Sequence, residues 1–213
     1  MAVIEGGLSG ALQEVDAGFL AARVSERPIP AHAWNSIGVR SGLLTNLAAD
    51  APIFSLRNLS SNLLLIRRLG FGAITTTAFT EAQVIEFALY IARAFTESDT
   101  EGTPIELTGN QAKHRTSLAS PSSIDLRIAD STALSVGTRT IDDVATCRIA
   151  AWSSAAGETI AARLDNLIKP SPGMYPIVLA QNEGLILHSV GSFSANGTVR
   201  VYLGIELAEM IAF

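Results

Sequence analysis

Hydrophobic and polar residues alternate with a period of two along much of the chain after Trp34. In the last segment the apolar side chains occupy every second position, namely Val199, Val201, Leu203, Ile205 and Leu207. Successive side chains of a strand point to opposite faces of a sheet, so this alternation is typical of a strand with one buried face. The pattern predicts a strand whose odd-numbered positions face the core.

A second apolar run, 185–193, precedes this segment, and Asn196-Gly197 separates the two. Asn-Gly tolerates the positive φ angles of a type I′ turn, which joins neighbouring antiparallel strands. The sequence therefore predicts that the two runs form a β-hairpin at the end of the chain.

Further strands are expected wherever apolar, β-branched runs lie between clusters of Ser, Pro, Gly and Asp, which favour turns. The expected ranges are 52–58, 62–77, 104–108, 124–129, 144–152 and 176–181. Short, regularly spaced strands with few helices indicate a mainly β fold, either a β-sandwich or a jelly-roll-like arrangement.

At most one or two short helices are expected. Thr80-Glu81-Ala82-Gln83 resembles a capping box, but the residues from Ile85 to Phe95 alternate in the manner of a strand. The interpretation favoured here is a short helical turn over 80–83 followed by a strand. The segment 160–168 is a second candidate for a short helix.

The first residues of the chain, 1–33, are expected to form an extended N-terminal arm, and 34–213 a single β-sandwich domain. The arm contains Pro28-Ile29-Pro30, which fits neither a helix interior nor a central strand. It is expected either to wrap its own domain or to reach a neighbouring subunit. The beginning of the chain lacks the basic region and apolar core of a secretion signal.

Composition narrows the class of protein. Apolar residues make up 48% of the chain and charged residues 16%, which excludes a disordered polypeptide. The formal net charge is −5 and the chain has only 15 Lys and Arg residues, so a nucleic-acid partner is not expected. No apolar stretch is long enough for a membrane helix, and the single cysteine, Cys147, excludes an internal disulfide framework.

Motifs for catalysis and cofactor binding are missing from the sequence. There is no Gly-x-Ser-x-Gly elbow and no Gly-rich phosphate loop with Lys-Ser/Thr. Gly70-Phe71-Gly72 begins like a dinucleotide fingerprint but has no third glycine. The three histidines His32, His114 and His188 lack a second ligand at metal-binding spacing, so each is expected at the surface or at a strand end.

The remaining candidate residues also favour structural roles. Cys147 is expected to be a small buried apolar residue. The adjacent Asp142 and Asp143 would point to opposite faces in a strand, and in a loop they could bind a cation but lack the other ligands of a calcium loop. Glu206 and Glu209 are expected to be solvated, and Trp34 and Trp152 to pack. The acceptor patterns at Asn58 and Asn196 mean little without a secretion signal. No catalytic, cofactor-binding or metal-binding residue is expected.

Several segments resemble a family of tailed-bacteriophage proteins. The similarity is carried by 74–83, 87–100, 107–117, 125–129, 133–140 and 176–184, and it covers roughly residues 35–210. The run Leu107-Thr108-Gly109-Asn110-Gln111-Ala112 and the run Pro176-Ile177-Val178-Leu179-Ala180-Gln181 are examples. The resemblance implies a virion protein and maps no catalytic residue onto this chain.

The function expected from this resemblance is that of a capsid decoration, or cement, protein on the outer surface of the virion. Its expected partners are the major capsid protein and copies of itself, with a trimer as one form, and it would be made in the host cytoplasm. No cofactor, nucleic acid or membrane is expected. The alternatives are a tail, baseplate or fibre-associated subunit, a module that binds host glycans, and an enzyme such as a depolymerase. Interface residues are expected in the arm, 2–30, and at the edges of the final hairpin.

Overall fold

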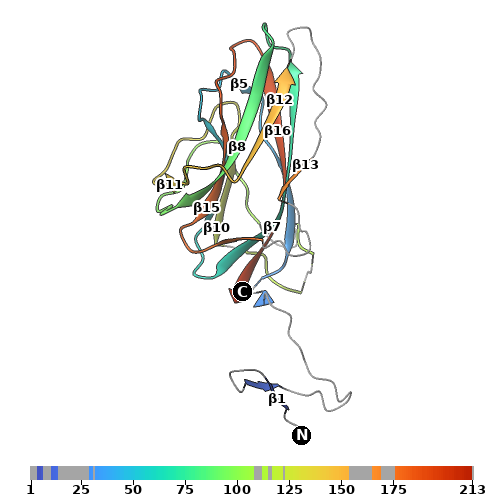
Figure 1. Ribbon diagram of the computed structural model, residues 1–213, viewed down its shortest axis with the longest axis vertical. Helices are drawn as coiled ribbons and strands as arrows, with labels where there is room; N and C mark the ends of the chain where they lie inside the picture. Colours follow the sequence, from blue (N-terminus) through green and yellow to red (C-terminus); the bar gives the residue numbers. More distant parts are fainter. Residues whose placement is uncertain are drawn as a thin grey trace.

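The computed structural model describes residues 4–6, 11–13, 29–30, 32–107, 112–114, 117–121, 123–153, 165–168 and 176–212. All regular elements in these ranges are strands. Apart from the short pair of β1 (Ile4–Gly6) and β2 (Ala11–Gln13), they form two antiparallel sheets of seven strands each, which pack as a β-sandwich (Figure 1). The predicted mainly β sandwich is therefore confirmed.

One layer, called here the β8 sheet, is ordered β11-β8-β15-β6-β10-β9, and β12 pairs with β8 as well. β15 lies between β6 and β8, so a late strand separates two early ones. The strands are β6 (Pro52–Asn58), β8 (Gln83–Arg93), β9 (Thr103–Pro104), β10 (Ile124–Ile128), β11 (Thr140–Ile141), β12 (Cys147–Ser153) and β15 (Gly184–Ser189).

The other layer, called here the β16 sheet, is built on two long central strands, β7 and β16, which pair along most of their length. β13 and β14 pair with the outer edge of β7, while β3, β4 and β5 pair with the outer edge of β16. The strands are β3 (Ile29–Pro30), β4 (Asn35–Arg40), β5 (Leu44–Thr45), β7 (Leu63–Thr77), β13 (Asp165–Ile168), β14 (Ile177–Leu179) and β16 (Thr198–Ala212).

Apolar side chains from the facing surfaces of both sheets form one continuous core. The rings of Phe71 on β7 and Phe87 on β8 lie 5.0 Å apart between the layers, and Phe193 meets Phe87 edge-on at 5.8 Å. The odd-numbered positions of β16 from Val199 to Leu207 are buried, as the alternation predicts. Burial of each such side chain contributes about 1.5–3 kcal/mol, so the core is the main source of stability.

The predicted hairpin between the last two long strands is wrong. β15 and β16 belong to different sheets, because both edges of β15 are already paired with β6 and β8, while β16 pairs with β7 and β4. Neither Asn196 nor Gly197 has a positive φ, so no type I′ turn forms. Gly197 is instead required by contact, since a Cβ atom there would lie 2.1 Å from the Phe79 ring.

Replacing Gly197 with alanine is expected to lower the free energy of unfolding by about 1–3 kcal/mol, because the Phe79 ring must move. Gly191 in the same connection is the matched control, since a Cβ atom there meets nothing within 4 Å. Urea unfolding of both variants measures the difference. Equal stability of the two variants would contradict the contact at Phe79.

The remaining strand predictions succeed to different extents. The range 52–58 matches β6, and β7, β10, β12 and β14 lie close to their expected ranges. Of the expected range 104–108, residue 108 lies outside the described residues, and only Pro104 of the others is strand, in β9. The helical turn over 80–83 is wrong, because a bend leads directly into β8. Residues 165–168 of the second helix candidate form β13, and 160–164 lie outside the described residues.

Most of the expected N-terminal arm, 1–33, also lies outside the described residues. Within it, β1 and β2 pair with each other, and β3 pairs with the end of β16 through Pro30 and Met210. The prediction that the arm reaches a neighbour stays a prediction.

Candidate functional site

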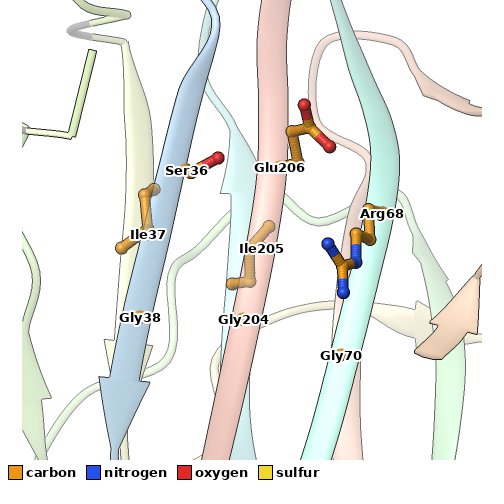
Figure 2. A pocket seen from close by; sticks show the side chains of 8 residues that line it. All are labelled: Ser36, Ile37, Gly38, Arg68, Gly70, Gly204, Ile205 and Glu206. Atoms are coloured by element: carbon orange, nitrogen blue, oxygen red, sulfur yellow. The ribbon is translucent and has the colours of Figure 1, made fainter. Parts of the chain in front are cut away.

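The outer surface of the β16 sheet is hollowed where three glycines lie side by side. Gly204 on β16 is in register with Gly38 on β4 and with Gly70 on β7 (Figure 2). Together with Ser36, Arg68 and Glu206 they line a hollow of ≈ 290 Å³. We call this feature the glycine-floored hollow.

The fold itself does not require two of these glycines. A Cβ atom at Gly38 or at Gly204 would meet nothing within 4 Å, and neither residue has a positive φ. Glycine inside a strand costs stability and often marks a place where another backbone or a ligand approaches closely. The two glycines therefore keep a surface open at the expense of strand stability.

Replacing Gly204 with alanine is accordingly expected to raise the free energy of unfolding by about 0.5–1 kcal/mol. The reason is that alanine restricts the unfolded chain and meets no obstacle in the folded one. Urea unfolding measures the change. A loss of stability would show that the fold needs this glycine after all.

Arginines surround the glycine-floored hollow. Arg40, Arg67 and Arg68 are exposed on the outer surface, Arg200 is partly buried there, and Glu206 is the acidic side chain among them. The Nη1 atom of Arg67 lies 3.6 Å from the Oε1 atom of Glu206. The guanidinium carbon of Arg67 also lies above the ring of Trp34, 5.8 Å from the ring centre. This surface is basic although the chain as a whole carries a formal charge of −5.

The outer surface of the β8 sheet is covered by loops that carry acidic groups. Phe95 packs there against Ala92 and Ile186, and the loops that follow β8 and β11 place Glu97, Glu101, Asp142 and Asp143 at the surface. In Figure 1 the loops around β11 stand on the side of the molecule away from β7. Beside the two aspartates, the side chain of Val144 is 79% exposed.

A buried ion pair joins the loop after β8 to the loop before β11. Arg139 and Asp99 contact each other with side chains only 3% and 0% exposed, and Asp99 also accepts the Gly137 N–H at 2.8 Å. Arg139 and Arg57 each lie over the Phe95 ring, at 5.3 and 5.7 Å from its centre. Burial lowers the pKa of Arg139 to about 10, so it remains charged at neutral pH.

His188 lies in the same layer, beside the ring of Tyr90, with ring centres 5.5 Å apart. Its pKa is lowered to about 4, mainly by burial and also by the nearby charge of Arg139, while Asp50 acts in the opposite direction. The imidazole is therefore neutral at physiological pH and serves as a packed, uncharged side chain.

Glu209 corrects a prediction, because it is buried rather than solvated. Its side chain is 2% exposed and lies 2.8 Å from the Nδ1 of His32. Ser60 Oγ and Asn62 Nδ2 both donate hydrogen bonds to its Oε1. The cluster connects the end of β16 to the turn between β6 and β7 and to the segment that enters β4, so its polar groups are used by the fold.

The three histidines are not brought together as a metal site. His32 contacts Glu209, His114 lies 2.6 Å from Ser36 Oγ, and His188 packs on Tyr90. Among the residues that the structure describes, no group of three or more His, Cys, Asp or Glu side chains could hold a metal ion. Cys147 is half-buried, and burial raises the pKa of its thiol.

Several other candidates have structural positions. Gly70 and Gly72 lie inside β7 and precede no helix. Asn58 is buried and donates hydrogen bonds to the carbonyls of Asn62 and Leu179, while Asn196 donates to Thr80. Asp142 accepts a hydrogen bond from Arg93 at 3.4 Å and lies in a loop rather than in a strand.

The two tryptophans differ from each other. Trp34 packs against the apolar cluster on the outer surface of the β16 sheet, as expected. The prediction for Trp152 is wrong, because its side chain is 61% exposed on β12, directly opposite Val84, which is 51% exposed. The Arg148–Glu86 ion pair, at 3.1 Å, lies nearby on the same two strands.

Comparisons with protein-family models, with curated proteins and with solved structures find no match to this chain. No helix in the described ranges could span a membrane.

Proposed function

We propose that the chain is a structural subunit of a tailed-bacteriophage virion, acting as a decoration protein on the outside of the capsid. It would bind the major capsid protein and stabilise the shell against the pressure of packaged DNA. The observation that supports a role in protein contact is the pair of outer surfaces described above. The outer surface of the β16 sheet is hollowed and basic, and the loops over the β8 sheet are acidic and carry the exposed side chain of Val144.

Three further points favour this proposal. Among the described residues, the deeply buried charged groups Asp99, Arg139 and Glu209 are all engaged in contacts with other side chains of the fold. The resemblance of the sequence segments described above to tailed-phage proteins is the basis for proposing this kind of particle. The acidic balance of the chain favours an outward position, away from packaged DNA.

The experiment compares complete particles with particles that lack this chain. If it is a decoration protein, particles without it lose infectivity faster on heating and on osmotic shock, and adding the purified chain back restores resistance. Unchanged resistance together with antibody label on the tail would instead support a tail or baseplate subunit. Absence of the chain from purified particles would contradict both positions.

Binding of host glycans is a second candidate, and the exposed Trp152 is the observation that favours it. Trp152 and Val84 are exposed opposite each other, adjoining exposed apolar side chains can mark an interaction site, and an indole ring offers a flat surface for a sugar ring. A glycan array probed with the purified chain tests this function. Binding that is lost in Trp152→Ala and kept in Val136→Ala, a control with another exposed side chain, would support it; no binding by the parent chain would reject it.

A further inference from the structure

We propose that the 142–146 loop of one copy of this chain docks into the glycine-floored hollow of a second copy, so that identical chains associate head to tail. The inference deepens the proposed role in an assembly and rests on it. It concerns a loop at the β11–β12 edge of the β8 sheet and the hollow on the outer surface of the β16 sheet.

The first surface is a projecting loop carried by rigid strands. β11 and β12 both pair with β8, and the loop between them is held at both ends, by the Asp142 N–H to the Ile91 carbonyl at 3.0 Å and the Thr146 N–H to the Leu89 carbonyl at 2.8 Å. Between these anchors the Val144 side chain is 79% exposed. A branched apolar side chain is thus presented to solvent on a fixed support.

The second surface is the glycine-floored hollow, which offers space that such a loop can enter. The hollow has ≈ 290 Å³ of space, and its floor at Gly38 and Gly204 is bare backbone with no atom above it within reach of a Cβ. An incoming loop can therefore approach the backbone of the sheet closely. Tyr202, Val39 and Arg40 continue the depression along β4 and β16.

The distribution of charge favours contact between the loop of one copy and the hollow of another over contact between two loops or between two hollows. In the loop, Asp143 is exposed next to Val144 and Asp142 is already paired with Arg93 at 3.4 Å, whereas Arg40 and Arg68 stand beside the hollow together with Glu206. Two copies that met loop to loop, or hollow to hollow, would bring like charges together, which disfavours association. Loop-to-hollow contact places the exposed carboxylate of Asp143 against the arginines beside the hollow.

A contact between two different surfaces of the same chain is heterologous, and it closes into a ring or continues as an open array. Each added copy again presents one loop and one hollow. Such repetition suits a subunit that covers a regular surface through many modest contacts.

The first test is sedimentation velocity of the full chain over a concentration series. We expect species larger than the monomer at an ionic strength of about 0.1 M. At about 1 M the Debye length falls from about 10 Å to about 3 Å, and we expect the apparent affinity to fall about tenfold. A chain that stays monomeric at every concentration and ionic strength would overturn the proposal.

The second test uses two variants that each lose one surface. Gly204→Phe fills the hollow, and V144K removes the exposed apolar group and adds a like charge opposite the arginines. Each alone is expected to weaken self-association by about 30-fold or more, as loss of a central contact does. Gly191→Phe is the matched control, because it adds the same side chain at another open glycine and should associate like the parent.

Mixing the two variants gives the most specific result. The intact loop of Gly204→Phe fits the intact hollow of V144K, so the mixture is expected to form a one-to-one dimer and nothing larger. If both variants are folded by circular dichroism and thermal unfolding but the mixture stays monomeric, head-to-tail docking is wrong. If Gly204→Phe fails to fold, Arg40→Glu with Arg68→Glu takes its place in the same mixing experiment.

The outcome is independent of the location of the chain in a particle. A head-to-tail array of purified protein that is absent from virions would contradict the proposed function alone. A virion protein that remains monomeric in solution would contradict this inference alone.

Discussion

Replacing Asp99 with alanine is expected to lower the free energy of unfolding by about 3–5 kcal/mol, because it leaves Arg139 charged and buried without its partner. The same change removes the acceptor of the Gly137 N–H. Urea unfolding at neutral pH measures the effect. We expect the loops over the β8 sheet to lose protection in hydrogen exchange before the core does.

Two controls make this prediction specific. Replacing both partners, as Asp99→Leu with Arg139→Met, is expected to recover most of the loss, since an apolar pair of similar size needs no compensating charge. Arg148→Met breaks an exposed ion pair with Glu86 and is expected to cost less than about 1 kcal/mol. If Asp99→Ala were no more harmful than Arg148→Met, the buried pair would not hold the loops.

The second large effect is a loss of stability in acid that depends on His188. Its pKa is about 4 in the folded chain against 6.5 for an unperturbed histidine, so between these pH values the unfolded chain binds more protons. The contribution is therefore fully present above pH 6.5 and is lost as the pH falls towards 4. The difference between the two pKa values corresponds to about 3 kcal/mol.

The measurement is the free energy of unfolding of the parent chain and of His188→Phe from pH 7 to pH 4. Phenylalanine keeps the contact with Tyr90 and does not titrate, so the difference between the two curves should grow by about 3 kcal/mol as the pH falls. His114→Gln, which changes a histidine bonded to Ser36, serves as the control. Parallel curves for the parent chain and His188→Phe would show that His188 titrates normally in the folded state.

The strands themselves could be predicted from the sequence, because alternation is a local signal. β16 follows it closely from Val199 to Leu207, with the odd-numbered positions facing the core, whereas β6 is buried at nearly every position. The assignment of strands to sheets could not be predicted in the same way. Asn196-Gly197 is compatible with a hairpin, and only the long-range pairing of β15 with β6 and β8 decides against it.

Two side chains were predicted wrongly although the sequence held a usable signal. Glu209 continues the odd-numbered register of β16 and therefore falls on the core side, where His32, Ser60 and Asn62 compensate its charge. Trp152 is out of phase with Cys147 and Ile149, which pack against the core, so it points outward. In both cases the phase of the alternation outweighs the general tendency of the residue type.

The glycine-floored hollow could not be predicted from the sequence at all. Gly38, Gly70 and Gly204 are far apart along the chain and meet only because β4, β16 and β7 pair in one particular register. The opposition of basic and acidic outer surfaces likewise depends on which sheet each loop covers.

The central claim is that this chain works by contact with other protein subunits in a virus particle. Imaging of intact, purified particles at a resolution that traces the chain tests it most directly. The account predicts many copies of the sandwich on the outside of the capsid, in contact with the major capsid protein. Particles whose every traced subunit is some other polypeptide would contradict it.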